Sequence, residues 1–156
     1  MKVFVGSASK YKSESFIIAS LRAFSKKVVD ERDIYKTELG KPFFKDKDLP
    51  LFSVSHSGEY IVCVFDDDII GVDIQKIKLI PNGVAKRYLK TDSQEPVQKT
   101  IEWTKFESYG KMIGTGVPYE EDYSKGHFLL SKKIQNYILT ICTKKECKQE
   151  LELVFI

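Results

Sequence analysis

Hydrophobic and polar positions follow two periods along this chain, one typical of strands and one typical of helices. Predicted strands are short apolar runs, and they cover residues 2–6, 51–54, 60–65, 69–75, 127–131, 136–142 and 149–155. Predicted helices have apolar residues three and four positions apart, and they cover residues 14–27, 84–90 and 97–113. Helices mixed with mostly antiparallel hairpins indicate an α+β fold.

Several polar segments mark the ends of these elements. Ser13 is suited to cap the first helix, and Gly114 is suited to end the last one. The acidic triplet 66–68 separates two apolar runs, which predicts a hairpin turn. Residues 28–50 are charged and contain glycine and proline, so we expect a surface excursion there rather than a core element.

Composition sets limits on the class of protein. The chain has 156 residues, of which 42% are hydrophobic and 30% charged, which predicts one ordered unit over residues 1–156. A net charge of +3 is too small to indicate a nucleic-acid partner. No apolar run approaches the roughly 20 residues that span a bilayer, and the N-terminus lacks a signal-peptide pattern. We therefore expect a cytoplasmic protein without a membrane partner.

The three cysteines support the same expectation. Cys63, Cys142 and Cys147 are odd in number, and their spacing fits no zinc site. Cys63 and Cys142 stand in apolar runs, so we predict that both are buried thiols of a protein in a reducing compartment.

The predicted strand 69–75 carries candidate metal ligands. Alternate residues of a strand share a face, so Gly71, Asp73 and Gln75 point the same way. A carboxylate and an amide oxygen on one rigid strand suit Mg²⁺, with the glycine leaving room for a ligand. The alternative is a strand end whose polar residues face solvent, and the strand alone does not decide between the two.

The predicted helix 97–113 carries a second set of candidates. Trp103, Glu107 and Lys111 are spaced by four residues and therefore line one face. Glu107 is either half of a solvated ion pair with Lys111 or a second metal carboxylate and base, in which case Lys111 holds a phosphate. Trp103 fits a core position equally well.

The segment Ser55–Gly58 joins two predicted strands. A serine hydrolase would have glycine two residues before its nucleophile and a helix after it, and neither is present here. Ser55 and His56 are better suited to contact a phosphate, although an isolated loop histidine is more often simply exposed.

Four sequence blocks occur in a fixed order: Gly-Lys-Pro at 40–42, Ser-His-Ser-Gly at 55–58, Gly-Val-Asp-Ile at 71–74 and Trp-x-x-x-Glu-Ser-x-x-Lys at 103–111. Together they resemble the 4′-phosphopantetheinyl transferase superfamily of the surfactin-synthetase-activating type. The resemblance covers about residues 40–117. It implies a pseudo-dimer of two small α/β halves with antiparallel strands.

In this chain the halves would be about residues 1–70 and 71–156, with the N-terminal half shortened. Residues that complete the pocket from that half do not align with the family, and Lys10, Lys12 and Arg22 are the candidates. We expect the chain to be a monomer.

The resemblance also implies an activity. The family transfers the 4′-phosphopantetheine group of coenzyme A to a serine hydroxyl of an apo-carrier protein of the acyl, polyketide or peptidyl type. The transfer requires Mg²⁺ and releases 3′,5′-ADP. By resemblance, Asp73 and Glu107 bind the metal and Gln75 stands at a third ligand position. Glu107 is also the general base, and Lys111 contacts the phosphates.

Coenzyme A contacts are implied for Lys41, Ser55 and His56, with His56 near the 3′-phosphate. Two positions depart from the family pattern, because Gln75 replaces a usual glutamate and Phe106 replaces a usual lysine. Phe106 lies three residues after Trp103 and is suited to pack in the core. The departures leave an alternative open: a divergent homologue that binds coenzyme A or a carrier protein but transfers weakly or not at all.

Overall fold

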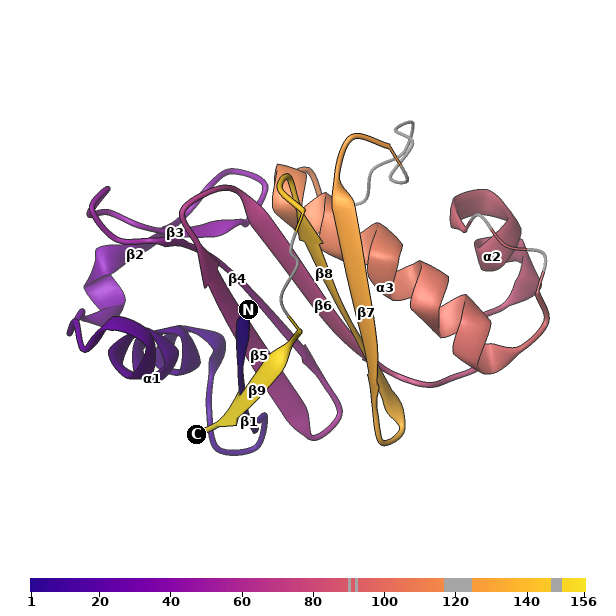
Figure 1. Ribbon diagram of the computed structural model, residues 1–156, viewed down its shortest axis with the longest axis horizontal. Coiled ribbons are helices and arrows are strands. Elements are labelled where there is room, and N and C mark those ends of the chain that lie inside the picture. Colours follow the sequence, from indigo (N-terminus) through magenta and orange to yellow (C-terminus); the bar gives the residue numbers. More distant parts are fainter. Residues whose placement is uncertain (90, 92, 117–124, 147–149) are drawn as a thin grey trace.

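The computed structural model describes residues 1–89, 91, 93–116, 125–146 and 150–156. Two β-sheets pack against each other, and one long helix covers the outer face of each sheet (Figure 1). This is a small mixed α/β architecture with antiparallel sheets.

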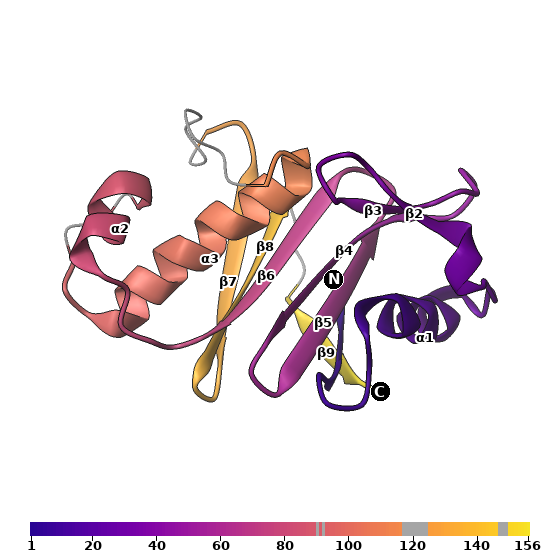
Figure 2. The ribbon, with the colours of Figure 1, turned by 180° about the vertical axis from the view of Figure 1, so that it is seen from behind.

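The first sheet has the strand order β4-β5-β1-β9. It contains β1 (Lys2–Ser7), β4 (Leu51–Ser57), β5 (Tyr60–Asp66) and β9 (Glu152–Phe155). Its neighbours pair antiparallel except β1 and β9, which are parallel. The last strand of the chain therefore completes the sheet in which the chain begins, and both termini lie on this side of the molecule (Figure 2).

The second sheet has the order β6-β8-β7 and is antiparallel throughout. It contains β6 (Ile70–Lys76), β7 (Phe128–Ile134) and β8 (Tyr137–Thr143). Helix α1 (Ser13–Ser25) covers the first sheet, whereas α3 (Pro96–Ile113) covers the second, with the short α2 (Asn82–Tyr88) beside it. A 3₁₀ turn (Glu31–Asp33) and the ribbon of β2 (Ile34–Lys36) and β3 (Pro42–Phe44) complete the described elements.

Strand alternation sorts the apolar side chains into separate layers. Val3, Val64, Val72 and Ile141 belong to a cluster shared by the two sheets. The intervening residues of the first sheet pack with α1, as Phe4 and Cys63 do against Phe16 and Leu21. On the other side, Phe106 and Met112 of α3 cluster with Cys142 of the second sheet.

Gly71 is the point of closest approach between β6 and α3. A Cβ at this position would lie 1.9 Å from the Ser108 carbonyl oxygen and 2.6 Å from the Met112 amide nitrogen. The expectation that this glycine leaves room for a ligand was therefore wrong, because the helix backbone occupies that space. Gly71 instead fixes the distance between the strand and the helix that carry the candidate metal ligands.

Most predicted elements are confirmed with shifts of one to three residues at their ends, including the α+β mixture itself. The expected helix cap and the expected role of residues 28–50 need correction. Ser13 does not cap α1: the cap is Lys12, whose backbone N–H donates to the Ser15 hydroxyl at 3.2 Å. Residues 28–50 are not only a surface excursion, because Phe44 and Leu49 are buried in the core under α1.

The prediction of a hairpin at 66–68 was wrong. The residues form a turn, in which the Asp68 N–H donates to the Asp66 carboxylate at 2.9 Å, but the flanking strands β5 and β6 belong to different sheets and pair with other strands. Other predictions are confirmed. Cys63 and Cys142 are buried free thiols, and Phe106 is a core residue. Cys147 lies outside the described residues. Among the residues described, no helix is both long and apolar enough to cross a membrane.

Candidate active site

A cavity of about 530 Å³ opens between the N-terminus of α1, the β2–β3 ribbon, strands β4 and β6, and one face of α3. All seven site residues predicted from the sequence line it: Lys41, Ser55, His56, Asp73, Gln75, Glu107 and Lys111. The volume lies within the range of roughly 300–1,000 Å³ that is usual for small-molecule sites. The predicted residues, far apart in the sequence, thus converge on one cavity.

Strands β4 and β6, which run parallel at the facing edges of the two sheets, are joined by serine side chains. The backbone N–H groups of Val72, Ile74 and Lys76 donate to the hydroxyls of Ser53, Ser55 and Ser57, at 3.0, 3.3 and 3.0 Å. We call this set of three bonds the serine seam. The three hydroxyls accept from backbone N–H groups along the edge of β6 that faces β4, in place of hydrogen bonds from a neighbouring strand's backbone.

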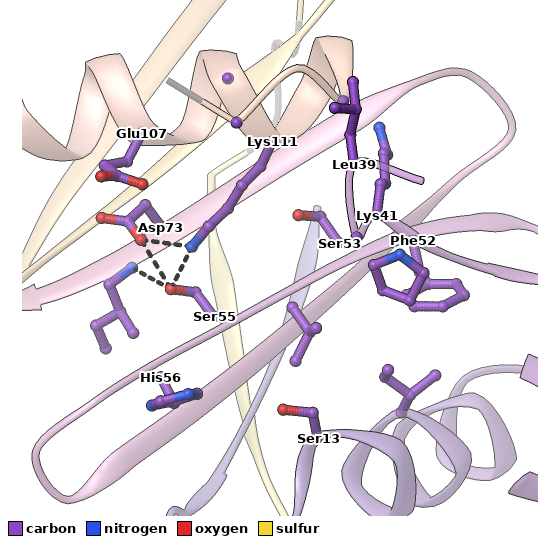
Figure 3. Close-up of a pocket in the computed structure, with 18 of the residues that line it drawn as sticks. Ser13, Leu39, Lys41, Phe52, Ser53, Ser55, His56, Asp73, Glu107 and Lys111 are labelled. Carbon is purple, nitrogen blue, oxygen red and sulfur yellow. Dashed lines mark hydrogen bonds and ion pairs between the residues drawn. The ribbon is translucent and has the colours of Figure 1, made fainter. Parts of the chain in front are cut away.

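The serine seam places Ser55 against Asp73 at the centre of the cavity. The Ser55 hydroxyl donates to Oδ1 of Asp73 at 2.8 Å, and the Lys111 ammonium donates to the same oxygen at 2.7 Å (Figure 3). Asp73 is only 5% exposed, and its other oxygen, Oδ2, is buried with no hydrogen-bond partner. A buried carboxylate oxygen without a partner is costly, so a missing ligand at Oδ2 is the simplest explanation.

Glu107 presents its carboxylate to Asp73 from α3 (Figure 3). Burial and the neighbouring Asp73 charge raise the pKa of Glu107, whereas Lys111 and Lys78 act in the opposite direction. Two carboxylates that face each other in a half-buried site repel, and a divalent cation between them relieves that repulsion.

The donor set fits a hard cation. Two carboxylates with space for phosphate and water suit Mg²⁺, which rarely has an all-protein cage. No group of three or more histidine, cysteine or acidic side chains that could hold a metal occurs among the described residues. The residues present therefore fit a magnesium ion shared with a substrate better than a structural zinc site.

Lys111 lies one helical turn beyond Glu107 and reaches across the cavity. Its ammonium also lies 2.7 Å from the Ser55 hydroxyl, so it bridges the serine seam and the Asp73 carboxylate. The Lys111 ammonium contacts Oδ1 of Asp73 and leaves the buried Oδ2 without a partner.

The remaining predicted residues line the edges of the cavity. The Gln75 amide nitrogen donates to the Ser57 hydroxyl at 3.1 Å, which ties this side chain to the serine seam. The Lys41 ammonium donates to the Met112 carbonyl in the last turn of α3 at 2.6 Å, and burial lowers the pKa of Lys41 to about 8. His56 is exposed and lies away from the Asp73 centre (Figure 3).

Some residues of the site were not found from the sequence. Ser53 lines the cavity and Ser57 belongs to the serine seam. Both alternate with Ser55, and that period of two was a signal for one shared strand face. Lys78 follows β6 and acts electrostatically on Glu107. At the cavity rim, Lys36 pairs with Glu14 at 2.8 Å.

The candidates proposed for completing the pocket from the N-terminal part, Lys10, Lys12 and Arg22, are absent from the described lining of the cavity. Ser13, Glu14 and Lys36 supply that wall instead.

Comparison with known proteins agrees with this geometry. No family model matches the chain. The chain is 36% identical over 101 residues to the 4′-phosphopantetheinyl transferase Sfp of Bacillus subtilis, which covers 57% of this chain and 45% of that protein. It is 32% identical over 100 residues to the transferase psf-1 of Bacillus pumilus, covering 57% of the chain and 43% of the relative.

A third relative, the transferase gsp of Aneurinibacillus migulanus, is 34% identical over 92 residues, covering 53% of the chain and 38% of that protein. The chain is thus similar to 4′-phosphopantetheinyl transferases of the Sfp type. It spans less than half the length of these curated relatives.

The structure explains one departure from the Sfp-type pattern. Phe106, where the family usually has lysine, is 2% exposed and packs near Trp103 and Tyr88, with ring centroids 6.1 and 5.7 Å away. Lys105 does not replace the missing lysine, because its ammonium pairs with Glu102 at 2.8 Å. The helix motif therefore keeps its acid and its final lysine and uses the variant position for the core.

Proposed function

We propose that the chain transfers the 4′-phosphopantetheine group of coenzyme A to a serine hydroxyl of an apo-carrier protein, with Mg²⁺ as cofactor and 3′,5′-ADP as the second product. The observation that carries this proposal is the buried, unpartnered Oδ2 of Asp73 in the same cavity as Glu107 and Lys111. Similarity to the 4′-phosphopantetheinyl transferases supports the reaction class, and the cavity has donors suited to a cation and to phosphates.

Asp73 and Glu107 would hold the cation. When bound, Mg²⁺ neutralises negative charge on the diphosphate of coenzyme A and on the leaving group. The two carboxylates sit on different rigid elements, β6 and α3, and the close packing at Gly71 sets their separation. Such rigid placement is what phosphoryl transfer requires, because the protein acts mainly by positioning and electrostatics.

Glu107 is the proposed general base. It is the carboxylate that faces Asp73 from α3 in the cavity, which places an acceptor for the proton of an incoming hydroxyl beside the proposed cation. The carboxylate takes the proton of the incoming serine hydroxyl, while the serine oxygen forms a bond to the phosphorus next to pantetheine. The bond from that phosphorus to the bridging oxygen breaks, and 3′,5′-ADP leaves with the electron pair.

Lys111 would contact the diphosphate. Its ammonium is held by Asp73 and Ser55, and the side chain lines the cavity. His56, exposed at the rim, is proposed to contact the 3′-phosphate, and the stem of Lys41 to line the coenzyme A pocket while its ammonium caps α3. Gln75 would contribute a neutral oxygen or leave its place to water.

The remaining sequence expectations stay proposals. They are a single unit of two halves, about 1–70 and 71–156, with a shortened first half. They also include a monomeric, cytoplasmic protein that binds neither nucleic acid nor membrane. The pairing of β9 with β1 supports one cooperative unit, because it ties the end of the second half to the first sheet.

A second candidate function is supported by Gln75 and Phe106, the two departures from the family pattern. In this alternative, the chain binds coenzyme A or a carrier protein and transfers weakly or not at all. A labelling assay separates the two. The protein is incubated with Mg²⁺, a fluorescent coenzyme A and a panel of apo-carriers of the acyl, polyketide and peptidyl types, and covalent label is read on a denaturing gel.

We expect wild-type protein to label at least one carrier and Asp73→Ala to label none. The matched control is Asp67→Ala, which removes an exposed acid of the turn between β5 and β6 and should label like wild type. Coenzyme A binding without label would favour the alternative. If neither binding nor label is detected with any carrier, both candidate functions fail.

A further inference from the structure

The hydroxyl of Ser55 has three close polar partners and is 5% exposed. It donates to Oδ1 of Asp73 at 2.8 Å, accepts from the Ile74 backbone N–H at 3.3 Å, and lies 2.7 Å from the Lys111 ammonium. A serine hydroxyl has one proton to donate and two lone pairs that accept. Its one proton is used by Asp73, so the hydroxyl has no proton left to donate to a phosphate oxygen of coenzyme A, even when Lys111 moves away.

Ser55 differs from the other two serines of the seam. Ser53 is equally buried and accepts from Val72 in the same way, and Ser57 accepts from Lys76 and from the Gln75 amide. Among the described hydrogen bonds of these three serines, only Ser55 also contacts a carboxylate, that of Asp73. The serine seam therefore joins β4 to β6, and at Ser55 it also contacts a candidate metal ligand.

The contact acts on the orientation of Asp73. A donor fixed to β4 holds Oδ1, so the carboxylate plane cannot rotate freely and Oδ2 is kept as the buried oxygen without a partner. Lys111 is the second donor to Oδ1, and the proposed function draws Lys111 away toward a phosphate. Ser55 would then be the donor that keeps Asp73 in place during the reaction.

We propose that Ser55 is a positioning residue, whose hydroxyl orients Asp73 so that Oδ2 faces the cation, rather than a contact to coenzyme A. This inference rests on the proposed function, since it gives the seam a role in metal binding. Partners that orient metal ligands through a hydrogen bond typically contribute about 10- to 100-fold to metal affinity.

The test compares Ser55→Ala with the matched variant Ser53→Ala. Each deletes one buried hydroxyl that accepts from a β6 N–H, but only the first removes a donor to Asp73. Mg²⁺ affinity is measured by titration calorimetry. Coenzyme A affinity is measured separately in EDTA.

We expect Ser55→Ala to weaken Mg²⁺ binding by about tenfold or more, and Ser53→Ala to leave it within about twofold. Coenzyme A affinity in EDTA should not change in either variant. Ser55→Thr, which retains a hydroxyl, should restore most of the Mg²⁺ affinity. Should Ser55→Ala fail to fold, Ser55→Cys keeps the volume with a much weaker donor and serves the same comparison.

Equal losses of Mg²⁺ affinity in the two alanine variants would overturn the inference, because the seam as a whole would then be responsible. Loss of coenzyme A binding in EDTA with normal Mg²⁺ binding would also overturn it and would make Ser55 a substrate contact. The carrier labelling assay stays independent. Wild type that binds Mg²⁺ through Ser55 but labels no carrier contradicts the proposed transfer alone, whereas wild type that binds no Mg²⁺ contradicts both.

Discussion

Replacing Gly71 with alanine should separate the two elements that carry the candidate metal ligands. The added Cβ would meet the Ser108 carbonyl oxygen at 1.9 Å and the Met112 amide nitrogen at 2.6 Å. Both atoms are α3 backbone, so no side-chain rotation relieves the clash. The oxygen has to retreat from 1.9 Å to the 3.4 Å of ordinary contact, a movement of about 1.5 Å by the helix, the strand or both.

The expected loss of stability is large. Overpacking a well-packed core by one methyl group costs about 1–3 kcal/mol, and a clash with rigid backbone belongs at the upper end or above. Moving α3 outward also loosens the buried contacts of Phe106 and Met112 with the second sheet. We therefore expect a loss of about 3 kcal/mol or more in the free energy of unfolding.

The same shift should weaken the site in molecules that remain folded. Glu107 and Lys111 belong to α3, whereas Asp73 belongs to β6, so a shift of the helix separates the candidate ligands. Mg²⁺ affinity should therefore fall together with stability. Urea unfolding followed by the fluorescence of Trp103, the one tryptophan of the chain, reports directly on α3.

Gly83→Ala is the matched control. Gly83 lies in α2 with nothing within 4 Å of an added Cβ, so alanine should stabilise the protein by about 0.5–1 kcal/mol. The reasoning fails if Gly71→Ala unfolds within about 0.5 kcal/mol of wild type and binds Mg²⁺ normally.

Three further predictions concern the charges of the cavity. Glu107→Gln should abolish transfer. In EDTA at neutral pH this substitution should also raise the free energy of unfolding, because the raised pKa of Glu107 means that its charge is disfavoured in the folded state. The gain in stability should disappear as pH falls toward 4.5, and a series of urea midpoints measured at different pH values checks it. Gln75→Glu should tighten Mg²⁺ binding in calorimetry by adding a third carboxylate, and an unchanged affinity would show that residue 75 does not face the cation. Burial lowers the pKa of Lys41 from 10.5 to about 8, so wild type should gain stability relative to Lys41→Met between pH 8 and pH 10.5, and a flat difference in urea midpoints would remove Lys41 from this role.

Local patterns in the sequence were sufficient for most of the elements, whereas the convergence of the site was predicted from the family resemblance. Period-two alternation in β6 put Asp73 on one face, and helical spacing put Glu107 and Lys111 on one face of α3. Each sequence block therefore showed which of its side chains share one face of the strand or helix. The resemblance carried by the four blocks implied which faces meet, and the residues predicted from it line one cavity.

Contacts between strands of different sheets could not be predicted in this way. The serine seam depends on β4 and β6 lying edge to edge, which no local period encodes. Likewise, the bond from Lys41 to the Met112 carbonyl joins residues 71 positions apart. Phe44 and Leu49 were missed because their charged neighbours dominate the local composition, although both side chains are buried.

The central claim is that Asp73 and Glu107 together bind one divalent cation. The most direct measurement is a titration with Mn²⁺ followed by electron paramagnetic resonance, for wild type, Asp73→Asn and Glu107→Gln, with the exposed-acid variant Asp67→Ala as control. The account predicts one Mn²⁺ per wild-type chain and a loss of affinity of at least about tenfold in each of the two site variants. Wild-type affinity in either site variant would contradict it.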